Sequence, residues 1–472
     1  MKEFEAENFR EQGHKLVDKL ADYLSGISKG EGHSVLPDRD PEALYQLFYN
    51  KLRAGENISL MELTDEFIAS SNHLHHPGYI GHQCTAPLPS AALTHFTAAL
   101  LNNGSAVFEM GPANTAMEKA LLTHIAQLLG YDESADGVLT HGGSAGNLTA
   151  LLAARQARSS YNIWEEGVDK ARLPAYIVSE QSHYSIARNL KIMGLGEASV
   201  IPVASDKQFR MRTDLLQETL DRARNEGKDV ICVVGNACST ATGSYDDLEC
   251  IADFCEENKL WFHVDGAHGM GALMSDRYRN LVKGVERADS VIIDFHKMFL
   301  ITGLNTAVIF KDGDRSYETF AQKASYLFEK THGKEWYNSA RRTLECTKSS
   351  MGFHAYTAFR LYGDKFFSDY IENTYGLARK FNRLISESTD FESVCEPEAN
   401  ILCFRYTGKE SDNINEVNLK IRDLLIKRGS FYIVQAELEG RIWLRVTIIN
   451  PLTDLGKLND LLKEIRYCAT VV

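Results

Sequence analysis

Two short apolar runs, each followed by a charged residue, constrain the fold of this chain more than any other feature. The first run, residues 260–264, precedes Asp265, and the second, residues 290–296, precedes Lys297. Short apolar runs bounded by polar residues are typical of buried parallel strands. Because open α/β sheets bind ligands at the carboxyl ends of their strands, both charged side chains are expected at one sheet edge.

A lysine at that edge is costly to bury unless it is paired or takes part in chemistry. We therefore interpret Lys297 as the residue that binds pyridoxal 5'-phosphate through a Schiff base. Asp265 would then pair with the pyridine nitrogen of the cofactor. This interpretation requires that Lys297→Ala lose the yellow chromophore, and unchanged cofactor binding in that variant would contradict it.

The segment 140–147 predicts a phosphate-binding loop. It is rich in glycine and precedes an alanine-rich stretch, residues 148–158, that is expected to be helical. Glycines let the backbone approach a phosphate, and free amides at a helix N-terminus bind anions. Such loops also occur elsewhere, but the position of this one ahead of Lys297 favours a cofactor site. The candidate residues are Gly143, Ser144 and Asn147.

The order of strand and helix patterns indicates an α/β fold. Strand patterns at residues 176–178 and 230–234 alternate with helical patterns at 213–224 and 246–258. Such alternation implies a mostly parallel sheet that is covered on both faces.

The last third of the chain has a different pattern, which predicts a small α+β lobe. Strands are expected at residues 400–406, 431–437 and 442–448, and helices at 415–427 and 454–466. The predicted domains are an N-terminal helical arm with the pocket entrance (1–78), a large cofactor-binding domain (79–348) and a small C-terminal α+β domain (349–472).

Composition argues against several other classes of protein. The net charge of −13 disfavours a nucleic-acid binder, whose affinity depends on neutralising phosphates. No window is as long and apolar as a transmembrane helix, and the charged N-terminus does not resemble a signal peptide. The nine cysteines include no Cys-x-x-Cys pair, which indicates reduced thiols rather than a disulfide framework or zinc ribbon. We therefore expect a cytoplasmic protein without a metal or membrane partner.

The motif Asp265-Gly266-Ala267-His268-Gly269, followed by His296-Lys297, resembles the group II amino-acid decarboxylases. These pyridoxal-phosphate enzymes of fold type I, the aspartate-aminotransferase fold, include glutamate, aromatic-amino-acid, cysteine-sulfinate and 2,4-diaminobutyrate decarboxylases. Further motifs follow in the family's order between about residues 75 and 452. The resemblance implies decarboxylation of an L-amino acid to its amine, and a homodimer with active sites at the interface.

The resemblance also implies roles for individual residues. His183 would stack on the cofactor ring, and Arg445 would bind the α-carboxylate of the substrate through its bidentate fork. Cys238-Ser239-Thr240 stands where the family usually has Gly-Thr-Thr, and its hydroxyls would lie beside the cofactor. Ala145 replaces a usual glutamate in the phosphate loop. Ala267 and His296 complete the implied cofactor contacts.

Substrate choice is the least determined property. His82 and Gln83 fall where family members carry specificity residues, and both are polar. Hydrogen bonding to a polar side chain discriminates strongly, so a diamino or acidic substrate is favoured, with an aromatic one kept open. In the family a lid carries the acid that protonates the product carbanion, and Tyr337 and His332 are the candidates here.

Several alternatives remain open from sequence. The chain could catalyse another reaction of this fold type, such as transamination or aldol-type cleavage, or be a non-catalytic scaffold. His183 could be a capping or core histidine, Arg445 could form a surface salt bridge, and His82 and Gln83 could simply line a loop.

Overall fold

The computed structural model describes residues 4–55, 57–320, 335–408 and 413–472. The chain divides into two compact units. The small unit comprises Met1–Ala86, Leu377–Val394 and Ile401–Val472, and the large unit comprises Pro87–Gly376 and Cys395–Asn400. The predicted three-part division at residues 78 and 348 stays a prediction.

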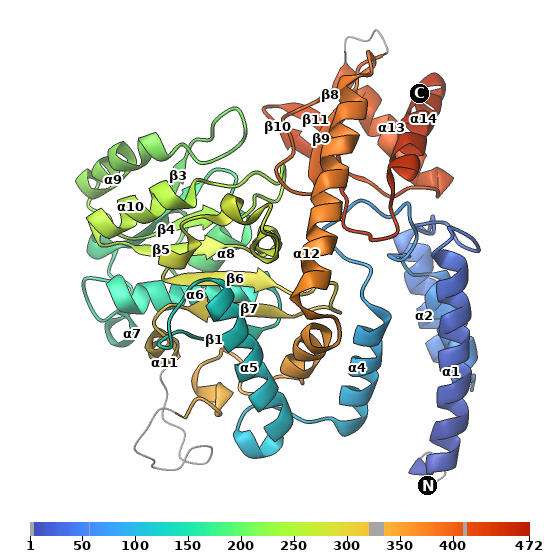
Figure 1. The fold of residues 1–472 in the computed structure, drawn as a ribbon, viewed down its shortest axis with the longest axis horizontal. Helices are drawn as coiled ribbons and strands as arrows, with labels where there is room; N and C mark the ends of the chain where they lie inside the picture. The colour runs from blue at the N-terminus through green and yellow to red at the C-terminus, as the bar shows by residue number, and fades with distance from the viewer. Residues whose placement is uncertain (1–3, 56, 321–334, 409–412) are drawn as a thin grey trace. The chain divides into compact units, whose positions relative to one another are not determined.

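A seven-stranded sheet forms the centre of the large unit (Figure 1). Its order is β1-β7-β6-β5-β4-β2-β3, and β7 runs against its neighbours while the remaining pairs are parallel. The predicted α/β fold with a mostly parallel sheet is therefore confirmed. The strands are β1 (Asp136–Thr140), β2 (Pro174–Ser179), β3 (Val200–Val203), β4 (Asp229–Asn236), β5 (Trp261–Asp265), β6 (Ser290–Asp294) and β7 (Thr306–Phe310).

Helices cover both faces of this sheet. Successive strand residues point to opposite sides, and the strands are buried along nearly their whole length, so both faces need cover. Val234 of β4 belongs to the core that includes the alanines of α6, whereas a Cβ on its neighbour Gly235 would meet Leu248 and Ile251 of α10. The helices of the large unit are α4 (Pro89–Leu101), α5 (Pro112–Leu128), α6 (Gly143–Arg158), α7 (Ile163–Glu166), α8 (Ser185–Ile192), α9 (Leu216–Asn225), α10 (Leu248–Asn258) and α11 (Asp314–Thr319). Helix α12 (Met351–Ser386) has a kink at Gly363.

Helix α6 begins five residues earlier than the sequence predicts, at Gly143 rather than residue 148. Glycine and serine have low helix propensity, which hid this start. Gly146 lets the first turn of α6 pack closely on β6 and β7. A Cβ at this position would lie 3.1 Å from Thr306 Cγ2 and 3.3 Å from Ile292 Cγ2. The early start places Gly143 and Ser144 in the first helical turn.

The small unit contains a four-stranded antiparallel sheet in the order β10-β11-β9-β8, which confirms the predicted α+β lobe. Phe404, Ile421, Leu444 and Leu461 lie in its core. The elements are α1 (Ala6–Ile27), α2 (Pro41–Ala54), α3 (Leu60–Ala69), β8 (Phe391–Ser393), β9 (Ile401–Tyr406), α13 (Ile414–Arg428), β10 (Val434–Leu438), β11 (Arg441–Thr447) and α14 (Leu455–Val471). Among the described residues, no helix is both long and apolar enough to cross a membrane.

Candidate active site

The large unit brings its functional side chains to the carboxyl edge of the sheet, as the strand patterns predict. Strand β5 ends at Asp265 and β6 ends at Asp294, and the two strands are paired in parallel. Lys297 follows β6 within one turn, and its backbone N–H donates to the carbonyl of Asp294 at 3.2 Å. Strand β1 ends at Thr140, so the glycine loop before α6 starts from the same edge.

Lys297, whose side chain is 20% exposed, forms an ion pair with the buried Asp294, with 2.9 Å between Nζ and Oδ2. Burial lowers the pKa of Lys297, but the charges of Asp294 and Asp265 outweigh burial and raise that pKa above its ordinary value. Burial raises the pKa of Asp294, but Lys297, His296 and the Thr306 hydroxyl together hold that pKa below its usual range. Both groups are therefore ionised at neutral pH.

Asp294 is a further candidate site residue, which the sequence pattern did not single out. It was counted as part of the apolar run 290–296, although a carboxylate three residues before the lysine was a usable signal. The side chain is 2% exposed, and Thr306 Oγ1 donates a hydrogen bond to Oδ1.

Asp265 is held by two donors and is buried. Asn147 Nδ2 donates to Oδ2 at 2.9 Å, and the N–H of Ala267 donates to Oδ1 at 3.3 Å. The structure thus places Asn147, predicted as a phosphate-loop residue, against the predicted pyridine partner. Ala267 makes its contact through the backbone.

His183 lies half-buried beside these charges. Its Nδ1 lies 2.8 Å from Ser185 Oγ. Burial lowers the pKa of His183, the charge of Asp265 partly offsets this, and Lys297 lowers the pKa further. The net lowering favours a neutral imidazole, which suits a ring that stacks on a cofactor.

The glycine loop leads directly into the N-terminus of α6, the kind of backbone end that binds anions. Gly142 has φ 92°, a conformation that favours glycine, and a Cβ on Gly143 would lie 3.1 Å from Asp294 Oδ2. Asn189 Nδ2 donates to the carbonyl of Ser144 at 2.9 Å and fixes the loop. The N-terminus of the 16-residue helix α6 adds a positive dipole end.

Other predicted cofactor residues have different surroundings. Ser239 is buried, and its hydroxyl lies 2.9 Å from Thr242 Oγ1 within its own loop. Thr240, the next residue, is half-buried. His296 Nδ1 lies 3.0 Å from the carbonyl of Asn305.

Arg445, His82 and Gln83 belong to the small unit. Arg445 lies on β11, is 5% exposed, and its Nη1 lies 3.5 Å from the carbonyl oxygen of Gly81. Burial lowers the pKa of His82, and the charges of Arg445 and Arg422 lower it further. His82 is exposed, and its lowered pKa favours a neutral imidazole next to the buried guanidinium of Arg445. Gln83 is half-buried.

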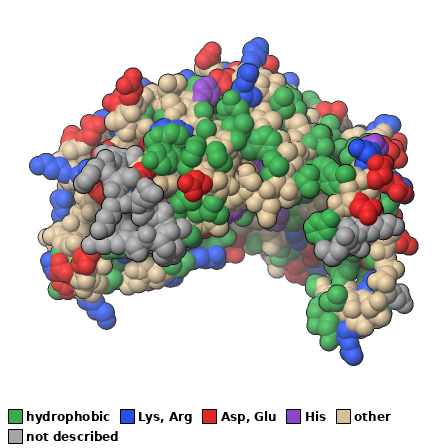
Figure 2. All heavy atoms as spheres, turned by 90° about the horizontal axis from the view of Figure 1, so that it is seen from below, with side chains coloured by type: hydrophobic (Ala, Val, Ile, Leu, Met, Phe, Trp, Pro, Cys, Tyr) green, Lys and Arg blue, Asp and Glu red, His purple; other side chains and the backbone are tan. Residues whose placement is uncertain are grey.

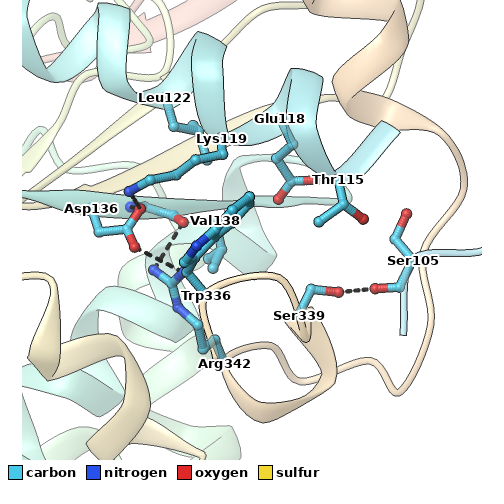
Figure 3. Close-up of a pocket in the computed structure, with 11 residues that line it drawn as sticks. Ser105, Thr115, Glu118, Lys119, Leu122, Asp136, Val138, Trp336, Ser339 and Arg342 are labelled. Atoms are coloured by element: carbon cyan, nitrogen blue, oxygen red, sulfur yellow. Dashed lines mark hydrogen bonds and ion pairs between the residues drawn. The ribbon is translucent and has the colours of Figure 1, made fainter. Parts of the chain in front are cut away.

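Of the two lid-acid candidates, Tyr337 is described and His332 lies outside the described residues. The ring of Tyr337 packs edge-on against Phe108, with 5.8 Å between ring centroids. A nearby cavity is lined by polar groups that include Glu118, Lys119, Asp136 and Arg342 (Figure 3). Its volume of about 20 Å³ suits one water, so it is too small for an amino acid.

The donor set of the large unit fits pyridoxal phosphate. An amine, a carboxylate with two bound donors, a neutral imidazole and a glycine loop at a helix N-terminus all come from one sheet edge. Gly143 lets the loop pack against the end of β6, because a Cβ there would crowd the Asp294 carboxylate.

Comparison with known proteins agrees with this chemistry. The family model described as "Pyridoxal-dependent decarboxylase conserved domain" matches residues 67–407. The chain is 26% identical to an aromatic-L-amino-acid decarboxylase of Bacillus atrophaeus, over 99% of the chain and 96% of the relative. It is 26% identical to an L-2,4-diaminobutyrate decarboxylase of Acinetobacter baumannii, over 87% and 83%. The crystal structure of mouse CSAD is similar with a TM-score of 0.91 and 25% identity, covering 98% of this chain and 99% of that one.

Proposed function

Since this chain belongs to the family of pyridoxal-dependent decarboxylases, we propose that it converts an L-amino acid with a polar side chain into the amine and CO₂. The chain is a pyridoxal-phosphate-dependent amino-acid decarboxylase. We propose that the side chain of its substrate is diamino or acidic. The observation that carries the proposal is His82. Its neutral imidazole offers a hydrogen bond that an aromatic hydrocarbon side chain would leave unused.

The residues of this chain have the following proposed roles. Lys297 attaches the cofactor covalently, Asp265 accepts the hydrogen of its pyridine nitrogen, and the loop at Gly143 and Ser144 binds its phosphate. When bound, the cofactor supplies an electron sink for the charge left at Cα after CO₂ departs.

The remaining roles concern the substrate. The guanidinium of Arg445 binds the α-carboxylate through its planar fork. Neutral His183 restrains the cofactor ring by stacking, and Tyr337 donates the proton that Cα receives. If Tyr337→Phe releases only amine, with no aldehyde by-product, the assignment of Tyr337 as that acid is wrong.

We also propose a cytoplasmic homodimer. Large apolar side chains are exposed on α4, among them Leu93, Phe96, Leu100 and Leu101. Hydrophobic side chains are also visible at the surface in Figure 2. A second copy of the chain would remove this apolar area from water. Sedimentation equilibrium of the holoenzyme tests the proposal, and a monomer at micromolar concentration would contradict it.

The substrate is tested by CO₂ release from purified protein with pyridoxal phosphate, one L-amino acid at a time, with identification of the amine. The greatest kcat/KM is expected for a diamino or acidic amino acid. A clear preference for an aromatic amino acid would overturn the substrate proposal and leave the decarboxylase intact. No CO₂, together with a spectral change on adding amino acids, would favour transamination or aldol-type cleavage.

A further inference from the structure

A continuous line of buried hydrogen bonds runs from the sheet core to Asp265. Trp261 Nε1 donates to Ser290 Oγ at 2.9 Å, and Ser290 Oγ lies 2.9 Å from His263 Nδ1. His263 Nε2 lies 2.9 Å from Asn147 Oδ1, and Asn147 Nδ2 donates to Asp265 Oδ2 at 2.9 Å. None of the five side chains is more than 6% exposed. Water therefore has little access to replace any of these partners.

The direction of each bond can be worked out from the Asp265 end. An ionised carboxylate only accepts hydrogen bonds, so the Asn147 atom that faces Asp265 must be the amide nitrogen. The second hydrogen of the same Asn147 nitrogen is donated to Ser185 Oγ, which lies 3.2 Å away. The Asn147 atom facing His263 is then the carbonyl oxygen, which only accepts. His263 Nε2 must therefore carry a hydrogen.

The other end accommodates the same tautomer through the Ser290 hydroxyl, although His263 Nδ1 also lies 3.2 Å from the backbone carbonyl oxygen of Ser290. The indole N–H of Trp261 can only donate, so Ser290 Oγ accepts from it and its own hydrogen is available for His263. His263 Nδ1 accepts that hydrogen in a neutral ring whose Nε2 is protonated. Burial lowers the pKa of His263 to about 4, although the charge of Asp265 and the hydrogen bond with the Ser290 backbone oppose this, so the ring is neutral at physiological pH. Every donor in the line points toward Asp265.

We propose that His263 is a positioning residue that orients the Asn147 amide and thereby holds Asp265 as an ionised acceptor for the pyridine nitrogen. The proposal rests on the proposed role of Asp265. Without the Nε2–H of His263, the Asn147 amide could turn over and present its carbonyl oxygen to the carboxylate, which would repel it. That repulsion would displace the Asp265 carboxylate from the position set by its two donors. A displaced carboxylate no longer favours a protonated pyridine.

The test uses full-length holoenzyme loaded with pyridoxal phosphate labelled with ¹⁵N in the ring, whose chemical shift reports protonation of the pyridine nitrogen. His263→Leu is expected to shift the signal toward the unprotonated value and to weaken cofactor binding about 10- to 100-fold, by analogy with the range found when hydrogen-bond partners of metal-binding side chains are removed. His263→Gln, which keeps a donor, is expected to restore most of both properties.

Two further variants keep the test decisive. Asn147→Ala removes the amide and leaves the imidazole ring of His263 in place. It should give the same ¹⁵N shift as His263→Leu, and it replaces that variant if His263→Leu does not fold. Tyr176→Phe is the matched control, because it removes a buried hydrogen bond from Tyr176 of β2 to the carbonyl of Leu151 in α6 and none of the hydrogen bonds in this line. It should leave the ¹⁵N signal unchanged.

The outcomes separate this inference from the function on which it depends. If folded His263→Leu and Asn147→Ala keep a protonated pyridine and the wild-type Kd, the line of bonds is only structural. If Asp265→Ala also keeps a protonated pyridine, the proposed role of Asp265 is wrong, and the role of His263 that depends on it is wrong as well.

Discussion

Replacing Asp294 by asparagine is expected to speed covalent loading of the cofactor at neutral pH. The amine of Lys297 must lose a proton before it can attack the cofactor aldehyde, and Asp294 stabilises the protonated form across 2.9 Å. Asparagine has nearly the same shape and can keep the bond from Thr306, so the change removes mainly charge. The wild-type loading rate should accordingly rise with pH, because the pKa of Lys297 is raised.

The size of the effect follows from the separation of the charges. At 2.9 Å and an effective dielectric constant of about 20, Coulomb's law gives about 6 kcal/mol as an upper value. A single opposite charge nearby is usually worth about 1.4 to 4 kcal/mol to an ionised group, and each 1.4 kcal/mol is tenfold. Asp265 remains in the variant and retains part of the stabilisation. We therefore expect roughly a 10-fold or greater rise in the population of neutral amine, and in the loading rate.

The assay mixes cofactor-free protein with pyridoxal phosphate and follows the yellow absorbance by stopped flow across pH. Asp312→Asn is the control, since Asp312 is an exposed carboxylate paired with Arg315 after β7. Loading that is slower in Asp294→Asn than in wild type would refute this reasoning, because Asp294 would then be the base that takes the proton. Equal loading rates in Asp294→Asn and wild type would show that the ion pair between Lys297 and Asp294 does not limit loading.

Three further predictions concern stability and the substrate. Lys348→Met should lower the free energy of unfolding of the large unit by about 3 to 5 kcal/mol, because it leaves the Glu118 carboxylate buried and unpaired where Lys348 Nζ lay at 2.8 Å. Urea unfolding measures this, and the double change Glu118→Gln with Lys348→Met should recover part of the loss; an unchanged midpoint would contradict the buried-charge argument. Arg445→Lys should lower kcat/KM about 10- to 100-fold, since a hydrogen bond to a charged group is worth about 1.5 to 3 kcal/mol and lysine lacks the fork; wild-type kinetics would remove Arg445 from carboxylate binding. His82→Phe should shift the ratio of kcat/KM values toward aromatic amino acids, and an unchanged ratio in competition assays would exclude His82 from specificity.

Much of the fold was predictable because its signals are local. The apolar runs ending at Asp265 and before Lys297 gave two parallel strands, and their carboxyl ends meet at one edge. The alternation of strand and helix patterns gave the α/β class, and the changed pattern of the last third gave the antiparallel sheet. The start of α6 was missed because glycine and serine weaken the helical signal where the loop becomes a helix.

The sequence by itself determined which residues stand at strand ends, since a strand is defined by its own neighbours along the chain. Only the tertiary structure decided which of these residues touch. His263 and Asn147 are 116 residues apart in sequence, yet His263 Nε2 lies 2.9 Å from Asn147 Oδ1. Asn147 and Asp265 are 118 residues apart, yet Asn147 Nδ2 lies 2.9 Å from Asp265 Oδ2. Ser239 likewise uses its hydroxyl within its own loop, which no motif reveals. The physical reason is that these contacts depend on the strand order β1-β7-β6-β5-β4-β2-β3, which differs from chain order and is fixed by packing of the whole sheet.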